Sequence, residues 1–187
     1  MGTRGTLKVY LNGKLKINQY NQWDSYPTGQ FMDICRFLAS KYNRECLVNA
    51  LETTAFLNKD AVELYRGDIR LIGNDERTAY IYSMALCNRD IGANILYLLA
   101  FSPRLYDPPR GLLAQGSPDK VNHVLVNWDD VFDGGLDLQE GNYELYLNKD
   151  DKGIRFQLVG NWHGKERDYR NTLPSKEEIE EWAKEGA

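Results

Sequence analysis

The sequence has few of the residues from which metal and redox sites are built. It contains three cysteines and two histidines in 187 residues, and none of them stands in a CxxC or HxxxH spacing. Transition-metal sites need several such side chains together, so the sequence predicts no metal and no other cofactor. An odd number of thiols also argues against a disulfide framework and favours a cytoplasmic location.

Motifs for phosphate binding and for covalent hydrolysis are missing as well. Neither GxGxxG nor GxxxxGK[ST] occurs, and there is no GxSxG. These absences exclude the nucleotide-binding enzymes and α/β-hydrolases that depend on such motifs. The longest apolar run, 95–101, is too short to span a bilayer, so no membrane partner is expected.

The chain carries too little positive charge for a broad nucleic-acid surface. Its formal net charge is −4 and its pI is near 5.3. A surface that tracks a phosphate backbone is usually strongly basic, so no extended nucleic acid is expected as a partner. The 187 residues suffice for one sizeable core, and we expect a single domain over 1–187. The oligomeric state stays open, a homo-oligomer included.

The most informative stretch present is 19–27, which reads QYNQWDSYP. It holds four side-chain amide or carboxylate groups and three aromatic rings. A turn gains from Gly, Pro, Asn or Asp but little from Trp and Tyr. Rings beside fixed hydrogen-bonding groups are typical of a pocket for a flat, polar small molecule. The stretch therefore predicts a recognition loop, with a nucleotide-derived ligand as a special case.

The same residues have a purely structural interpretation. Trp23 is equally expected as a half-buried anchor of the loop, and Asp24 as a turn or helix cap toward Tyr26 and Pro27. Most of the twelve tyrosines are expected at the edge of the core, with their hydroxyls in water. The residues alone leave both interpretations open.

Hairpin signals frame the two ends of the chain. Two alternating segments, 7–11 and 14–20, flank Asn12-Gly13, the dipeptide most typical of a tight hairpin turn. The segments 143–148 and 154–159 alternate in the same way and predict a second hairpin. We therefore expect a mostly antiparallel sheet that both hairpins share.

Helical patterns fill the middle of the chain and its end. Pro27 is placed to open a helix whose apolar face comprises Phe31, Ile34, Cys35 and Leu38. Blocks of strands and helices that are segregated in this way favour an α+β fold with helices packed on the sheet. Further helices are expected at 46–57, at 60–65 as a short turn, and at 91–101 after an Asp90 cap. A last helix is expected from Ser175, which forms a capping box with Glu178. A strand is expected at 122–127, and a long loop excursion at about 102–120 is expected to be either a lid or an insertion.

The predicted ligand site gathers polar groups at the junctions of these elements. Arg4 enters the first strand beside the loop, because neighbouring strands lie about 5 Å apart. Gln30 lies one turn into the first helix, with its amide directed back toward the loop. Arg89 can meet an anionic group, although a helix cap with a surface ion pair is the simpler explanation of Arg89-Asp90. The predicted site comprises Arg4, Gln22, Trp23, Asp24, Tyr26, Gln30, Arg89 and Asp90.

Three segments carry a resemblance: TRGT at 3–6, the run at 19–27, and RDIGA at 89–93. Together they resemble a family of small, largely uncharacterised proteins found in phages, bacteria and fungi. Its members open with Thr-Arg-Gly, carry Gln-Trp-Asp-Gly/Ser-Tyr-Pro after a hairpin and repeat Arg-Asp-x-Gly-Ala. The resemblance covers about the first hundred residues and implies that these segments matter. Its phage members imply sequestration of a host signalling nucleotide as one function.

A strand, a hairpin and a Trp-Asp loop are also similar to the entry of N-terminal-nucleophile hydrolases. Those enzymes need Cys, Ser or Thr as the first mature residue, because the free α-amine acts as the base. Here Gly2 follows Met1, and Thr3 becomes terminal only after a second cut. The similarity therefore implies a related scaffold without the nucleophile.

Three functional hypotheses follow from the sequence. The leading one is a non-enzymatic binding protein for a small polar ligand. The second is a hydrolase of amide or phosphodiester bonds that uses Thr3 or Asp24. The third is a protein-interaction module, with the Pro-rich segment 102–119 or the acidic segment 129–137 as its contact surface.

Overall fold

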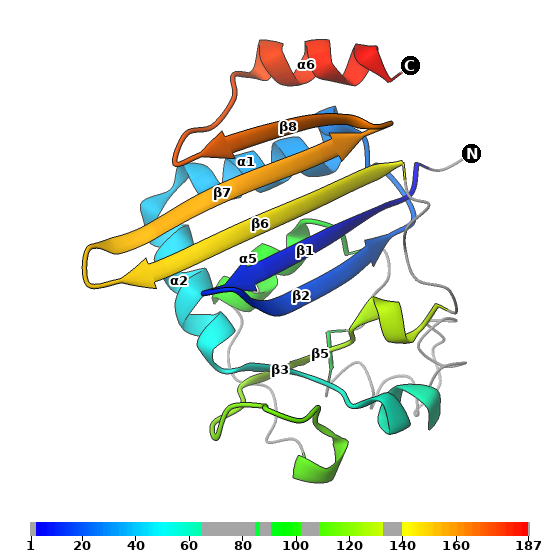
Figure 1. Cartoon of the computed structure of the whole chain (residues 1–187), viewed down its shortest axis with the longest axis vertical. Coiled ribbons are helices and arrows are strands. Elements are labelled where there is room, and N and C mark those ends of the chain that lie inside the picture. Colours follow the sequence, from blue (N-terminus) through cyan, green and yellow to red (C-terminus); the bar gives the residue numbers. More distant parts are fainter. Residues whose placement is uncertain (1–2, 65–84, 87–90, 102–108, 133–139, 187) are drawn as a thin grey trace.

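The computed structural model describes residues 3–64, 85–86, 91–101, 109–132 and 140–186. Its main element is a five-stranded sheet in the order β2-β1-β6-β7-β8, with helices packed on it (Figure 1). All neighbouring strands in this sheet are antiparallel except β1 and β6. The predicted α+β class and the mostly antiparallel sheet are therefore confirmed. The strands are β1 (Gly5–Leu11), β2 (Lys14–Asn21), β6 (Gly141–Asp150), β7 (Gly153–Trp162) and β8 (Lys165–Arg170).

The first hairpin turns where the Asn-Gly dipeptide predicts it. Asn12 and Gly13 have φ values of +48° and +78°, and both lie between β1 and β2. Both central residues of the favoured two-residue turn need positive φ, which explains the choice of Asn and Gly. The parallel pairing of β1 with β6 then joins this hairpin to the C-terminal one, with Gly5 opposite Gly141.

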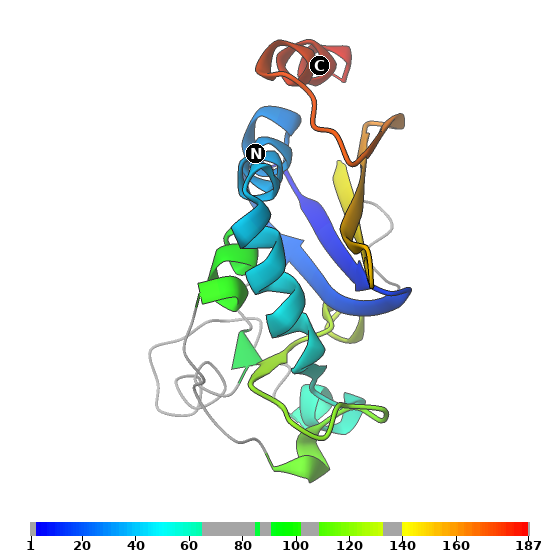
Figure 2. The same cartoon turned by 90° about the vertical axis from the view of Figure 1, so that its left-hand side faces the viewer.

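A helical layer covers one face of this sheet (Figure 2). A wide helical turn, Pro27–Phe31, runs directly into α1 (Met32–Ala39), and α2 (Lys41–Glu52) and α5 (Asn94–Phe101) pack beside it. The predicted apolar face of the first helix is confirmed, because Phe31, Ile34, Cys35 and Leu38 are all buried in the main core.

The second helix was predicted too late in the chain. It begins at Lys41 and ends at Glu52, whereas the apolar pattern placed it at 46–57. The Ser40 side chain accepts a hydrogen bond from the Asn43 N–H and caps the start. At the other end, the Thr54 hydroxyl bonds back to the Ala50 carbonyl, and the chain leaves as a strand. Thr and Phe favour such a half-buried strand once a partner is available.

The helix predicted at 91–101 is three residues shorter, because α5 begins at Asn94. Gly92 has a φ of +52°, which right-handed helical backbone cannot adopt. The predicted cap, Asp90, lies outside the described residues.

A second, smaller sheet lies beside β2, with its own core around Trp128 and Val131. Its strands are all parallel, in the order β3-β5-β4: β3 (Thr54–Phe56), β5 (His123–Leu125) and β4 (Ala85–Leu86). Within the expected excursion at 102–120, Leu113 is buried and forms an isolated antiparallel bridge with Leu57, which directly follows β3. The described part of that excursion therefore packs on the second sheet. The short helix expected at 60–65 is present at 59–64.

The C-terminal segment adds one strand that no sequence pattern predicted. β8 is almost entirely charged, and it forms an exposed edge, where charged side chains discourage pairing with other chains. The final helix, α6 (Lys176–Glu185), begins with the predicted capping box between Ser175 and Glu178. Within the described ranges, no helix has the length and hydropathy needed to cross a membrane.

Candidate ligand-binding site

The loop after β2 is held against the sheet by close backbone packing. Ser25 is fully buried, its carbonyl oxygen accepts a hydrogen bond from the Tyr143 hydroxyl at 2.6 Å, and its N–H donates to the Thr3 carbonyl at 3.3 Å. A Cβ built on Gly5 would lie 2.6 Å from Ser25 Cβ, and one on Gly141 only 2.2 Å from the Ser25 carbonyl oxygen. Glycine at these two positions is what lets the loop approach so closely.

A buried asparagine shapes the turn within this loop. Asn21 donates from its side-chain amide to the Trp23 carbonyl and to Ser25 Oγ. Asp24 has a φ of +56°, a conformation that Asp tolerates better than most residues, and its carbonyl accepts a hydrogen bond from the Gln30 N–H at 3.0 Å. No side chain caps the helical turn at Pro27. The turn-stabilising role considered for Asp24 is therefore taken by Asn21.

A cleft of about 260 Å³ opens beside the loop. It lies between the loop, the wide helical turn and the segment before α5. Small-molecule sites typically measure roughly 300–1,000 Å³, so the described cleft suits a single ring system better than a dinucleotide. The residues that line it are Asn21, Trp23, Asp24, Tyr26, Thr28, Gly29, Gln30, Asp33, Ile91, Gly92, Ala93 and Asn94.

Two exposed aromatic rings form the rim of the cleft. Trp23 is 52% exposed and Tyr26 is 38% exposed, whereas the other three tryptophans of the chain, all within the described residues, are buried. The Tyr26 hydroxyl donates to Asp24 Oδ1 at 3.1 Å. That hydrogen bond and the carboxylate charge raise the pKa of Tyr26 above its ordinary value. The rim thus presents two aromatic faces beside a carboxylate, and the exposed fraction of Trp23 fits both a half-buried anchor and a ligand contact.

The side chain of Gln30 lines the cleft from the helical turn. Gln30 is only 4% exposed, and neither its amide oxygen nor its amide nitrogen has a hydrogen-bond partner among the described residues. A buried polar group without a partner costs about 1–3 kcal/mol. Such a group in a native structure calls for an explanation, such as a functional role or a polar partner outside the chain, for example an ordered water or an ion.

The other four predicted residues are not among the described residues that line the cleft. Arg4 is exposed, and its backbone pairs with Glu140, so it shares this end of the sheet without being among the described residues that line the cleft. The amide oxygen of Gln22 already accepts the Tyr20 hydroxyl at 2.5 Å. The pair 89–90 lies outside the described residues. Contacts of these four residues with a ligand stay predictions.

Eight of the twelve described lining residues were missed by the sequence interpretation, Asn21 and Gly92 among them. Asn21 stands inside the recognition run, but nothing in the sequence marks it as a buried residue that lines a cleft. Gly92 belongs to the RDIGA segment, and a glycine just before a helical pattern was its only signal. A Cβ built on Gly92 would lie 2.9 Å from Gln30 Oε1 and 3.4 Å from Asn21 Nδ2, so Gly92 lies close to both side chains.

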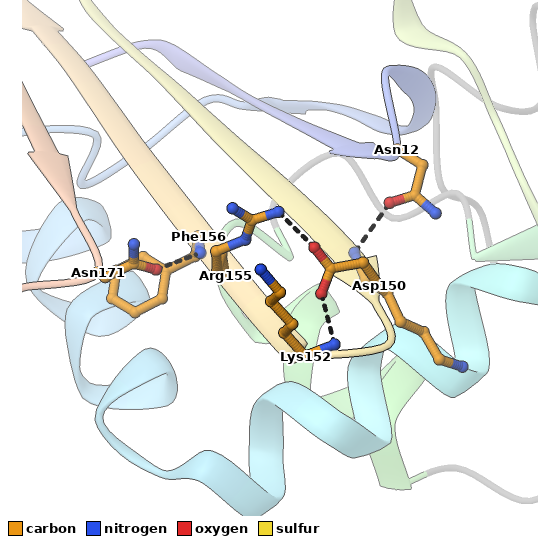
Figure 3. Close-up of polar contacts among 7 residues, drawn as sticks. Asn12, Asp150, Lys152, Arg155, Phe156 and Asn171 are labelled. Atoms are coloured by element: carbon orange, nitrogen blue, oxygen red, sulfur yellow. Dashed lines mark hydrogen bonds and ion pairs between the residues drawn. The ribbon is translucent and has the colours of Figure 1, made fainter.

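A larger hollow of about 590 Å³ lies at the tip of the C-terminal hairpin, between that tip and α2. Polar groups at this hairpin tip bond to neighbouring residues of the chain (Figure 3). Asp150 Oδ2 lies 2.5 Å from the Arg155 guanidinium, and Asp150 Oδ1 accepts the Lys152 N–H at 2.9 Å. Asn12 Oδ1 accepts the Lys149 N–H at 2.9 Å and ties the two hairpins together. We name this hollow the hairpin groove, and its contacts explain hairpin structure without a ligand.

Within the part of the chain that the structure describes, no three His, Cys, Asp or Glu side chains gather as a metal-ion site would require. Comparisons with known proteins leave the site to be judged on its own geometry. No protein-family model matches the chain, and neither a curated protein nor a solved structure shows significant similarity to it.

Proposed function

We propose that this protein binds a small, flat, polar molecule in the cleft beside Trp23 and does not transform it chemically. The observation that carries the proposal is the pair of exposed rings, Trp23 and Tyr26, at the mouth of a cleft. Exposed aromatic side chains are costly to leave in water, and stacking on a planar ligand would remove them from it. Asp24 adds an acceptor for a donor group at the rim.

Features of the surrounding structure support a preformed stacking loop. The Ser25 backbone is held by the Tyr143 hydroxyl and packs against the two glycines, so the loop is anchored at Ser25 without a ligand. A rigid loop loses little conformational entropy on binding, which is the advantage of preorganisation. Nucleotide-derived ligands stay within the proposal as far as their base and sugar are concerned. Capture of a phage-relevant signalling nucleotide would be one biological use of such a site.

Intrinsic fluorescence offers a direct test. Trp23 is the exposed tryptophan among four, so iodide should quench mainly its emission. The probes are nucleobases, nucleosides and aromatic carboxamides, each added at millimolar concentration. We expect at least one of these classes to shield Trp23 from iodide and to raise the melting temperature. Trp23→Ala should lose the thermal shift, whereas Tyr42→Ala, which removes an exposed ring on α2 away from the cleft, should keep it.

Two results would contradict the proposal. One is the absence of any shielding or thermal shift across the panel. The other is an equal thermal shift in Trp23→Ala and in the wild-type protein.

The hydrolase hypothesis has no comparable observation in its favour. The described lining residues include Asp24, Thr28 and Asp33 but neither histidine nor cysteine. The Thr3 carbonyl accepts a hydrogen bond from the Ser25 N–H at this end of the sheet. The protein-interaction hypothesis rests on segments that are only partly described, and we carry neither hypothesis further.

A further inference from the structure

The unsatisfied amide of Gln30 defines what kind of ligand the cleft would select. A glutamine amide carries one acceptor and two donors in a single plane. A carboxamide or lactam edge, in which an N–H stands beside a C=O, complements this arrangement with two parallel hydrogen bonds. A carboxylate offers only acceptors and would set oxygen against Gln30 Oε1. The buried amide therefore discriminates between these two chemical classes.

Gly92 covers this amide. The short distance from a Gly92 Cβ position to Gln30 Oε1, 2.9 Å, shows that bare backbone lies directly on the amide oxygen. The amide atoms are shielded from solvent in this arrangement. A ligand can reach them only if the turn at 91–93 shifts away. That turn precedes α5, which is anchored in the core by Ile95 and Leu96. Because Ala93 is also buried in the core and Ile91 packs against it, we expect the shift to be local to the Gly92 backbone.

We propose that Gln30 is the specificity-determining residue of the cleft, that it recognises a planar ring bearing a lactam or carboxamide edge, and that the Gly92 turn is the cover that moves to admit this edge. The inference rests on the proposed ligand-binding function and deepens it. Trp23 and Tyr26 would supply the stacking face, and the Gln30 amide would supply the edge-specific pair of hydrogen bonds. Nucleobases with an N–H/C=O edge and aromatic carboxamides are the two chemical forms of this class.

Matched ligand pairs test this assignment. 1-Methyluracil has one N–H flanked by carbonyls, and 1,3-dimethyluracil has lost it; nicotinamide and nicotinate differ only in amide against carboxylate. Binding is followed by NMR titration, which detects millimolar dissociation constants and reports the Gln30 side-chain amide signal. We expect at least one pair in which the edge-bearing member binds about tenfold or more tightly, because a bidentate contact discriminates to that extent. We also expect the Gln30 side-chain signal to move with that member.

Two variants keep the test independent of folding failure. Gln30→Met keeps the length of the side chain, and Gln30→Leu keeps a buried side chain of similar size. Each variant removes the amide donor and the amide acceptor together. Because no hydrogen bond is lost in the free protein, we expect melting temperatures at least equal to that of the wild type. In both variants the two members of the pair should bind equally.

The outcomes separate this inference from the proposed function. If ligands bind and Trp23→Ala weakens them, but the pair members are not distinguished, the binding function stands and the Gln30 assignment fails. If both Gln30 variants melt well below the wild type, the amide is already hydrogen-bonded in the free protein, and the assignment also fails. If no probe binds at all, both the inference and the proposed function fall.

Discussion

The cleft and the hairpin groove make a useful comparison because the larger hollow is the less convincing site. In the hairpin groove, Asp150 bonds to Arg155 and to the hairpin backbone, so its charge and lone pairs are engaged. In the cleft, two rings stand exposed and the Gln30 amide lacks partners among the described residues. Polar groups that are already hydrogen-bonded or ion-paired within the chain indicate a structural role, whereas buried polar groups without such partners indicate a partner outside the chain. Volume by itself would have favoured the hairpin groove.

The two regions also differ in how they are supported. The recognition loop lies on two glycines and a buried tyrosine hydroxyl, whereas the hairpin tip is held by exposed ion pairs. Exposed ion pairs contribute little to stability. Disruption of the support should therefore cost far more at the loop than at the tip.

The largest effect is expected for Gly5→Ala, which breaks the support of the loop. The new methyl group would meet the Gly141 carbonyl oxygen at 2.2 Å and Ser25 Cβ at 2.6 Å. We expect the free energy of unfolding to fall by about 3 kcal/mol, together with loss of ligand-dependent thermal shifts. Urea denaturation followed by circular dichroism measures the change. Gly111→Ala, where a Cβ meets nothing within 4 Å, is the matched control and should stay within about 0.5 kcal/mol of the wild type; equal losses in both variants would refute the packing argument.

A smaller loss is expected for Tyr143→Phe. It removes the hydroxyl that donates to the Ser25 carbonyl at 2.6 Å and leaves that carbonyl short of a partner. The free energy of unfolding should fall by about 1–2 kcal/mol. Tyr97→Phe, at a partly exposed ring on α5, serves as the control and should change stability by no more than about 0.5 kcal/mol. A Tyr143→Phe variant as stable as its control would show that the loop does not depend on this bond.

The helix behind the cleft gives a prediction for alkaline pH. Burial raises the pKa of the Cys35 thiol from its ordinary value near 9 to about 12. In the unfolded chain this thiol ionises above pH 9, whereas in the folded protein it stays protonated. The contribution of this group to the free energy of unfolding is therefore fully present below pH 9 and is lost as the pH rises toward 12. At pH 10 the loss should be about 1 kcal/mol. Cys35→Ala should show a flatter stability profile between pH 9 and 10, and identical profiles for the two proteins would be incompatible with a buried thiol.

The smallest effect is expected in the hairpin groove. Asp150→Ala removes the ion pair with Arg155 and the bond from the Lys152 N–H, both at the surface, and should cost about 0.5–1 kcal/mol. Asp151→Ala is the control, because Asp151 makes no hydrogen bond or ion pair with another described residue. Neither variant should change ligand binding measured by thermal shift. Loss of binding in Asp150→Ala alone would move the site from the cleft to the groove and reverse the comparison.

Local patterns predicted much of the fold because they act over a few residues. The Asn12-Gly13 turn, the Pro27 start and the Ser175–Glu178 box each depend on backbone geometry that their own residues prefer. The helix predicted at 46–57 was misplaced because apolar periodicity does not mark the ends of a helix. Ser40 caps an earlier start, and the hydroxyls of Thr53 and Thr54 bond to the Ala50 carbonyl at the end. β8 was missed because a charged edge strand owes its structure to its neighbour, not to its own residues.

By itself, the sequence determined the hairpins, the apolar face of the first helix and the concentration of rings and amides in one loop. Those properties follow from residues adjacent along the chain. Only the tertiary structure decided that Gly5 and Gly141 lie under Ser25, and that Gly92 covers Gln30. Two of these three pairs, Gly141 with Ser25 and Gly92 with Gln30, join residues more than 60 positions apart, and no local propensity encodes them. The physical reason is that tertiary packing decides whether an amide is buried and whether a hydrogen-bond partner lies within its reach, and packing is a property of the whole fold.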